Sequence, residues 1–431
     1  MVSIEDLSPE IIEQILLELD PLDVAAFSQT CREYASQIYD PSNELFWRKL
    51  YLNQPLDDPR ECITELGYPV DSKIQWRQRL QRIIRARTIV ENPDRCHPDE
   101  RTTIVETLLS LALELPPTHG EELSLNSAYL VTLLRGGKFI DSPLWVPSPE
   151  EKQLRARLHT YFGLTTLDFR HRRRTETRGT VYALRNYKRE NFYGPFLPDE
   201  SGRVDWELTQ CIHHVMSMHI VPPSLGDAGF VTYAMSLPFC LSLMPPDNDL
   251  DNVEDWAGIT GQWLCSFCFI DHRELLAYNH ISLEQLNVVP SDVPLDTSLF
   301  DDPEFEEIFR TIIVNFQLDR SEKDPDHPTR PILHFSGKIQ NEYRMFGWVK
   351  VTPDDCIRWH FHFQESGEPG NALWSSEGVQ IGGVRSMYGV LGVWTTVEHD
   401  PHDPVGPFWL RKNLDYEPEL STTSEAADSD H

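Results

Sequence analysis

Cysteine, histidine and acidic side chains gather at two places in the sequence with spacings that could hold a metal ion. Cys265 and Cys268 form a Cys-x-x-Cys pair, and the segment His399–Asp403 reads His-Asp-Pro-His-Asp. A zinc site of this kind needs a second pair at a similar spacing, and none is present. Alternation along a strand also sends the two sulfurs to opposite faces. The proline-broken His399–Asp403 segment is typical of a solvated turn, so we expect no metal and no other cofactor.

Catalytic motifs are also missing from the sequence. His213, His214 and His219 lie on one predicted helix, but His214 and His219 are five residues apart and no His-Glu-x-x-His pattern occurs. There is neither a Gly-x-Ser-x-Gly elbow nor a phosphate-binding glycine loop. Cys31 is interpreted as a small thiol in a helical core rather than a nucleophile. We therefore expect no catalytic residues and a protein that is not an enzyme.

Positive charge is concentrated in one region, Arg170–Arg174, followed by Arg178, Arg185, Lys188 and Arg189. Phosphate or nucleic-acid binding is one interpretation, and an internal counter-charge or solvated loop is the alternative. The whole chain has 38 Lys and Arg residues against 68 Asp and Glu residues, a net charge of −30. This acidic balance favours the alternative and argues against nucleic acid or an anionic membrane as the main partner.

Length and composition point to an ordinary multidomain protein. A chain of 431 residues predicts two or three domains. Its longest apolar runs fall well short of the roughly 18 residues that a membrane-spanning helix needs. The first residues lack the basic start and apolar core of a signal peptide. Eight cysteines without a secretory signal are expected to be reduced, so we expect a cytoplasmic or nuclear protein without membrane association.

The first 52 residues predict short amphipathic helices. Ser8, Pro9 and Glu10 are typical of a helix start, and Asp20–Pro21 ends the helix. Its apolar stripe consists of Ile11, Ile12, Ile15, Leu16 and Leu19. Two further helices are predicted over 22–28 and 31–38. Helices this short cannot enclose a core of their own, so apolar surface is left for another element or protein to cover.

This segment resembles the F-box motif. Six elements occur in the expected order, namely Leu7–Ile12, Ile15–Leu16, Leu19–Pro21, Asp23–Val24, Ser28–Arg32 and Phe46–Leu50. F-box segments dock on the Skp-family adaptor, and through it on cullin, in Skp/cullin/F-box ubiquitin ligases. The resemblance implies that the adaptor contacts Leu7, Pro9, Ile11, Ile12, Ile15, Leu16 and Leu19. The alternative is a helical hairpin that packs on the rest of this chain.

The remainder divides into a helical part and a β-rich part. Helices are predicted over 73–90, 102–115, 125–134, 149–163 and 204–220. Alternating apolar residues then predict strands over 262–270, 311–318, 332–339, 343–351, 356–363, 379–384, 390–397 and 408–412. About eight antiparallel strands suffice for a barrel or sandwich. We therefore expect an α+β protein with an F-box at 3–52, a helical spacer at 60–245, a β domain at 255–412 and a disordered acidic tail at 417–431.

Two further resemblances concern the β domain and the whole chain. Gly261-Gln262-Trp263 resembles the opening of calycin-like barrels, which implies that Trp263 closes the barrel floor beside a basic residue, here Arg411. Blocks along the chain resemble large fungal F-box proteins, namely Leu154–His159, Asp255–Gly258, Asp271–Leu276, Glu377–Gly383 and His402–Trp409. In layout the chain is also similar to animal F-box-only proteins whose C-terminal barrel captures a substrate degron.

Three functions remain open at this point. The first is a substrate receptor of a ubiquitin ligase that directs an unknown target protein to ubiquitination and proteasomal degradation. The second is an F-box protein whose barrel binds a small ligand or peptide terminus as a ubiquitin-independent regulator. The third is a metal-dependent enzyme fused to an F-box. Target capture is assigned to Arg385, Met387 and Tyr388 in a glycine-rich segment, and the alternative is a tight connection between two strands.

Overall fold

The computed structural model describes residues 7–413 apart from 42, 71–72, 120–123, 136, 142–144, 227, 241, 244–253, 282–292, 340–342 and 366–371. The predicted tail at 417–431 lies outside these residues. Within them, no helix has the length and apolar composition needed to span a membrane.

The N-terminal part is a group of four short helices, α1 (Pro9–Leu17), α2 (Pro21–Ser28), α3 (Arg32–Tyr39) and α4 (Glu44–Leu52). Prolines occupy the first positions of α1 and α2, where their missing N–H is not needed. The carboxylate of Asp20 caps α2 by accepting the N–H of Leu22 at 2.9 Å. The helices pack around Phe46 and Trp47, which are buried in contact with the rest of the helical core.

The middle of the chain is helical, as predicted. It contains α5 (Trp76–Glu91), α6 (Arg101–Leu113), α7 (Leu125–Leu134), α8 (Lys138–Asp141), α9 (Pro149–Phe162), α10 (His171–Val181) and α11 (Trp206–Ile220). A short parallel pair, β1 (Thr118–His119) and β2 (Ser242–Leu243), joins distant parts of the chain. The basic stretch Arg170–Arg174, for which a solvated loop was one interpretation, lies at the start of helix α10. Arginine is a good helix former, and Thr177 and Val181 give this helix a buried side.

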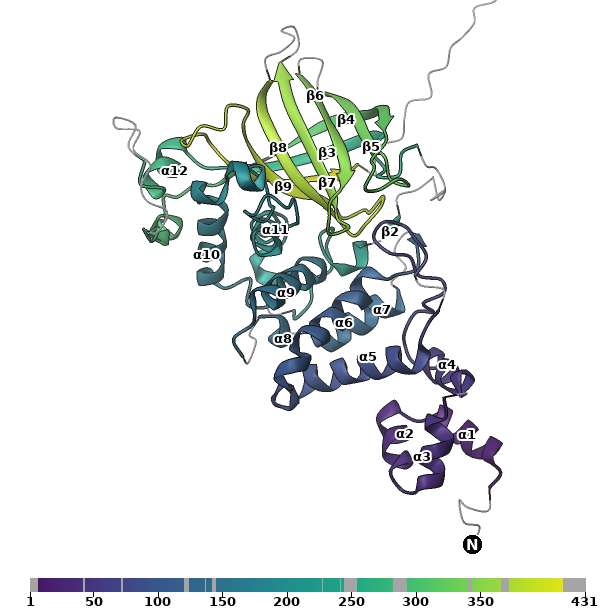
Figure 1. The fold of residues 1–431 in the computed structure, drawn as a ribbon. Helices are drawn as coiled ribbons and strands as arrows, with labels where there is room; N and C mark the ends of the chain where they lie inside the picture. The colour runs from purple at the N-terminus through teal and green to yellow at the C-terminus, as the bar shows by residue number, and fades with distance from the viewer. Residues whose placement is uncertain are drawn as a thin grey trace, which may run out of the picture.

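The C-terminal part is a closed antiparallel barrel of eight strands (Figure 1). Its strands are β3 (Gly261–Phe269), β4 (Ile308–Glu322), β5 (Ile332–Ile339), β6 (Tyr343–Val351), β7 (Ile357–Glu365), β8 (Ala372–Ile381), β9 (Gly389–Thr396) and β10 (Gly406–Lys412). The order around the barrel follows the sequence, and β10 closes it by pairing with β3. The prediction of an α+β protein with a C-terminal β-barrel is confirmed. Helix α12 (His272–Tyr278), between β3 and β4, was not predicted.

Large aromatic side chains fill the barrel interior. The ring of Trp359 lies 5.3 Å from the rings of both Trp263 and Phe335, and all three are almost fully buried. Phe361 and Phe408 continue this cluster 5.3 Å apart. Every second residue of β7 supplies it, as the alternation predicted. The interior of this barrel is therefore a packed core, as expected for a small barrel.

The basic residue that covers Trp263 is Lys412, and the assignment of Arg411 was wrong. Lys412 lies opposite Trp263 in the β3–β10 register, so both side chains point to the same face, and its ammonium lies 5.0 Å from the Trp263 ring centre. Arg411 lies opposite Leu264 and its guanidinium packs on Trp409 instead. Burial lowers the pKa of Lys412 to about 8.

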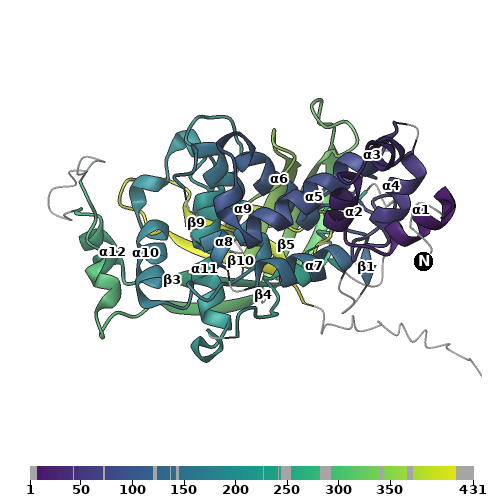
Figure 2. The ribbon, with the colours of Figure 1, turned by 90° about the horizontal axis from the view of Figure 1, so that it is seen from below.

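The middle helices cover one side of the barrel, and the N-terminal helices α1–α3 extend beyond it. In Figure 1, α9, α10 and α11 lie below the barrel, and α1–α3 lie at the far lower end of the molecule. Viewed from below, α1–α4 are at one end and α12 is at the other (Figure 2). One continuous apolar cluster runs from Ile12 in α1 to Leu391 and Trp409 on the outer face of the barrel. The two ends of the molecule are thus joined by a common core.

The segment 62–70, which follows α4, inserts into one end of the barrel. Leu66 is buried in the same cluster as Trp359, and its carbonyl accepts the Nε–H of Arg330 at 3.0 Å. The carbonyl of Glu65 accepts the N–H of Val384 at 2.8 Å, between β8 and β9. Gly67 makes this turn with a φ of 77°, a conformation that other residues rarely adopt. The barrel is therefore closed at this end by a residue nearly 200 positions before its first strand.

Replacing Leu66 with alanine is expected to destabilise the barrel by about 2–5 kcal/mol, because it removes buried side-chain volume from the barrel core. Urea unfolding followed by tryptophan fluorescence measures this loss. Leu225→Ala is the control, since Leu225 is 40% exposed, and should change the unfolding midpoint little. Equal effects of the two substitutions would contradict the insertion of Leu66 into the core.

Candidate functional site

An exposed apolar face lies on the first helix. Ile11 and Ile15 are 50% and 42% exposed, and their spacing of four places them on one side of α1. In the same N-terminal part, Leu22, Leu45 and Leu52 are also exposed. Five of the thirteen large apolar side chains that are exposed within the described residues thus lie in the first 52 residues. Such a concentration is typical of a surface that another protein covers.

The predicted adaptor-binding residues divide between this face and the protein core. Pro9 is exposed alongside Ile11 and Ile15. Ile12 and Leu16, at 5% and 4% exposure, are buried in the core, so their assignment to an exposed adaptor face was wrong. The physical reason is that α1 packs its opposite side on α4, where Asn53 Nδ2 also donates to the carbonyl of Leu17 at 3.1 Å. The other two, Leu7 and Leu19, are partly buried against the same core.

The residues assigned to target capture are structural. Tyr388 is fully buried and its hydroxyl donates to the carbonyl of Thr160 in α9 at 2.8 Å. Arg385 is 6% exposed, and Met387 is half-buried. The segment joins β8 to β9 and packs against the helices, so the alternative interpretation, a tight connection between strands, is the correct one. Buried side chains of this kind offer no anchor to a target.

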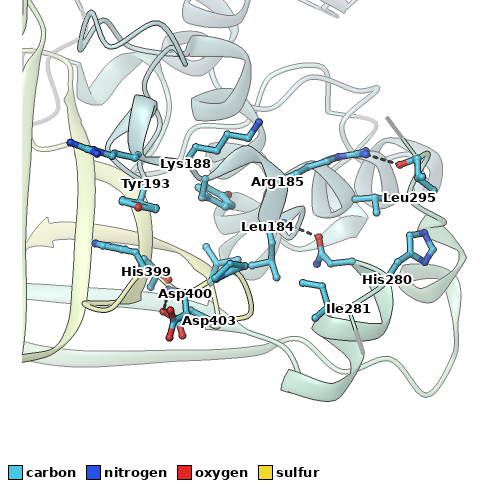
Figure 3. A pocket seen from close by; sticks show the side chains of 17 residues that line it. Leu184, Arg185, Lys188, Tyr193, His280, Ile281, Leu295, His399, Asp400 and Asp403 are labelled. Atoms are coloured by element: carbon cyan, nitrogen blue, oxygen red, sulfur yellow. Dashed lines mark hydrogen bonds between the residues drawn. The ribbon is translucent and has the colours of Figure 1, made fainter. Parts of the chain in front are cut away.

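A pocket of about 550 Å³ lies elsewhere, where the helical part meets the barrel (Figure 3). One wall is the turn from η4 (Leu184–Asn186) to η5 (Arg189–Asn191), and another is the end of α12. The N–H of Leu184 donates to Asn279 Oδ1 at 2.8 Å, which fixes these two walls together. The third wall is the connection from β9 to β10, where Asp403 accepts the N–H of Asp400 at 2.7 Å.

The pocket has an apolar middle and charged edges. Leu184, Ile281, Leu295 and Val405 supply the apolar side chains. The positive side chains of its lining are Arg185, Lys188 and Arg189. Figure 3 shows Lys188 and Arg185 on one edge and Asp400 and Asp403 on the opposite edge. A hollow of this size with a few convergent polar groups has the usual form of a ligand-binding site.

Backbone strain is concentrated around this pocket. Tyr193, His280 and His399 line it, and each has a φ between 54° and 57°. They are three of the seven residues other than glycine with a positive φ in the described residues. The rings of Tyr193 and His399 stack at 3.8 Å and nearly parallel. Such conformations cost energy and tend to occur at functional sites. Sequence reasoning missed this pocket because its walls come from three distant segments.

A buried ion pair supports the wall that carries Tyr193. Arg358 Nε and Nη2 each donate to the carboxylate of Glu377 at 2.8 Å, and His360 Nδ1 lies 2.7 Å from it. Burial would raise the pKa of Glu377, but Arg358 and His360 hold it below its usual value. The guanidinium of Arg358 also lies 4.4 Å from the ring centre of Phe192, the residue before Tyr193. These contacts tie the Tyr193 turn to β7 and β8.

The described residues contain three clusters in which side chains of metal-binding type lie close together. They are Asp141–His159–Asp168, His219–Cys268–Glu307 and Asp400–His402–Asp403. The first is already hydrogen-bonded, since His159 Nε2 lies 2.8 Å from Asp168 Oδ2 and His159 Nδ1 lies 2.7 Å from Gln210. In the second, His219 Nε2 lies 2.8 Å from Glu307. In the first two clusters, these contacts favour hydrogen-bonded polar networks over metal sites.

The other residues considered for metal binding have structural roles. Cys265 lies in the barrel interior and Cys268 on its outer face, so the prediction of opposite faces is confirmed. His213 Nε2 lies 3.0 Å from the carbonyl of Met235, and His214 Nε2 lies 2.9 Å from that of Asp168. Burial lowers the pKa of His213 to about 3 and that of His214 to about 4. Both imidazoles are therefore neutral at physiological pH.

The comparison with protein families decides the identity of the N-terminal helices. The family model of the F-box domain matches residues 4–45. This chain contains an F-box domain at its N-terminus. F-box domains generally bind the Skp-family adaptor and so connect to cullin, and F-box proteins are generally non-catalytic substrate receptors of ubiquitin ligases. No curated protein and no solved structure matches the chain, so the relation of this F-box protein to fungal members stays a prediction.

Asp141→Asn is expected to stabilise the protein at neutral pH. Burial raises the pKa of Asp141 to about 6, so the folded state holds this proton more tightly than the unfolded state. The stability linked to this group is complete below about pH 4 and is lost as the pH rises through 6. At pH 7.5 the variant should gain about 3 kcal/mol, since a shift of about two pKa units is worth 1.36 kcal/mol per unit. Urea unfolding at pH 7.5 and pH 4.5 measures the difference.

The control for this prediction is Asp326→Asn, because Asp326 is an exposed carboxylate. It should not change stability at either pH. A stabilisation by Asp141→Asn that persisted unchanged at pH 4.5 would mean that the carboxylate charge is not the cause.

Proposed function

We propose that this F-box protein is the substrate-recognition subunit of a Skp/cullin/F-box ubiquitin ligase, with the adaptor bound to the Ile11–Ile15 face of α1. The observation that carries the proposal is the exposure of these two isoleucines within the segment matched by the F-box family. Apolar side chains at this exposure gain free energy when a partner covers them. The charge of the chain and its packed barrel both suit a protein target rather than nucleic acid.

In this proposal the protein forms and breaks no bonds itself. Other subunits transfer ubiquitin, and the receptor holds the target near them, which raises its effective concentration. A fixed distance between the adaptor end and the target end favours this role. The contacts of α4 with α5, such as the Tyr51 and Trp76 rings 5.5 Å apart, support such coupling. The packing of segment 62–70 into the barrel core couples the helices to the barrel.

The alternative function is a ubiquitin-independent regulator. It requires the barrel to enclose a small ligand or a peptide terminus. The described interior of the barrel is occupied by Trp263, Phe316, Phe335, Trp359 and Phe361.

The ubiquitin-ligase function also fits a cytoplasmic or nuclear location, where cysteines remain reduced, and all eight cysteines are free thiols.

A pull-down of a Skp-family adaptor by the purified full chain tests the proposal. Replacing both Ile11 and Ile15 with aspartate would place two charges in an apolar interface and should weaken binding by at least about a hundredfold. Leu16→Asp is unsuitable for this purpose, because Leu16 lies in the core and its substitution would unfold the helices.

The matched control replaces Leu125 and Leu225 with aspartate. These leucines are exposed to a similar extent, at 51% and 40%, but lie far along the chain from the F-box segment. Binding that survives in the control and is lost in the α1 variant supports the proposal. Adaptor binding that persists in the α1 variant, or that is undetectable with the wild type, would overturn it.

A further inference from the structure

We propose that the pocket between η4, α12 and the β9–β10 connection binds an acidic peptide segment of the target protein, with an apolar side chain of that segment in the pocket. This inference rests on the proposed function, which supplies the need for a target. It adds the location of target capture and the chemical class of what is captured.

Three arginines that precede the pocket edge in the same basic stretch are committed to ion pairs. Arg172 pairs with Glu176 at 2.8 Å, Arg173 lies 3.6 Å from Asp168, and Arg178 pairs with Glu307 at 2.8 Å. Lys188 and Arg189 are exposed and form no ion pair within the described residues. These two exposed positive charges lie beside a pocket in a chain whose net charge is −30. They complement acidic side chains of a bound segment.

The interior of the pocket fits an apolar side chain. Leu184, Ile281 and Leu295 are only partly buried, so they retain apolar surface that a ligand can cover. The volume of about 550 Å³ is that of a site for a few side chains. Burial of one leucine-sized side chain supplies affinity, and the charged edge selects among candidate segments.

The third wall offers a contact for peptide backbone. The Nδ1 atom of His399 is buried and has no hydrogen-bond partner within the described residues. An unpaired buried nitrogen is unfavourable, and a peptide N–H or C=O entering the pocket could pair with it. Burial lowers the pKa of His399, which keeps its imidazole neutral and able to donate or accept. Asp400, next to it, repels a second acidic group, so the acidic residues of the segment should face Lys188 and Arg189.

An array of short peptides tests the inference directly with the purified full chain. The array places two adjacent glutamates at every spacing from a single leucine in a Gly/Ser background. Matched sets carry lysines in place of the glutamates, or serine in place of the leucine. We expect selective binding of peptides with both glutamates and leucine. Lys188→Glu combined with Arg189→Glu should reduce this binding about tenfold or more.

The control is Lys338→Glu combined with Arg344→Glu. These two exposed residues lie opposite each other on β5 and β6, and the change in net charge is the same. Loss of binding in the pocket variant alone supports the inference. Equal loss in both variants would overturn it, because a general electrostatic field would then explain the binding. A wild-type chain that selects no glutamate–leucine peptide, while it still binds the Skp-family adaptor, would overturn this inference and leave the proposed function standing.

Discussion

The arrangement of this F-box protein depends on the insertion of segment 62–70 beneath the barrel. Leu66 completes the barrel core, while the carboxylate of Glu65 forms an ion pair with Arg157 of α9. One short segment therefore contacts the barrel and the helices at once, and it directly follows the F-box helices. Because this segment is packed into the barrel core, the barrel and the adaptor-facing helices are physically coupled.

Buried ion pairs then set the orientation of the parts. Arg157 pairs with Glu65 across the helix–barrel boundary, and Arg358 pairs with Glu377 beneath the Tyr193 turn. Removing such charges from water costs about as much as their attraction returns, so their contribution is to geometry more than to net stability. The second pair holds one wall of the pocket. The contact of Arg358 with Phe192 holds the strained backbone of Phe192 and Tyr193 in place.

The sequence predicted most of the regular elements, but it missed α10, α12 and most of β8, and it predicted the tertiary contacts poorly. Strands such as Ile332–Ile339 and Tyr343–Val351 were predicted with their exact bounds, because the alternation of apolar and polar residues indicates which side chains face the core. Periodicity could not tell which apolar residues of α1 face the partner, since Ile12 and Leu16 share a stripe with Ile15. Glycines near Tyr388 resembled a binding loop but serve a tight turn. The pocket is formed by segments that lie more than 200 residues apart in the sequence, so no local sequence pattern could predict it.

The central claim is that one end of a single coupled molecule binds the adaptor and the other end remains free for a target. Amide hydrogen exchange of the full chain, with and without a Skp-family adaptor, tests it most directly. The account predicts that the adaptor slows exchange in α1 and its neighbouring F-box helices and leaves the amides around His399 and Tyr193 unchanged. Protection of the barrel and pocket with no change in α1 would contradict it.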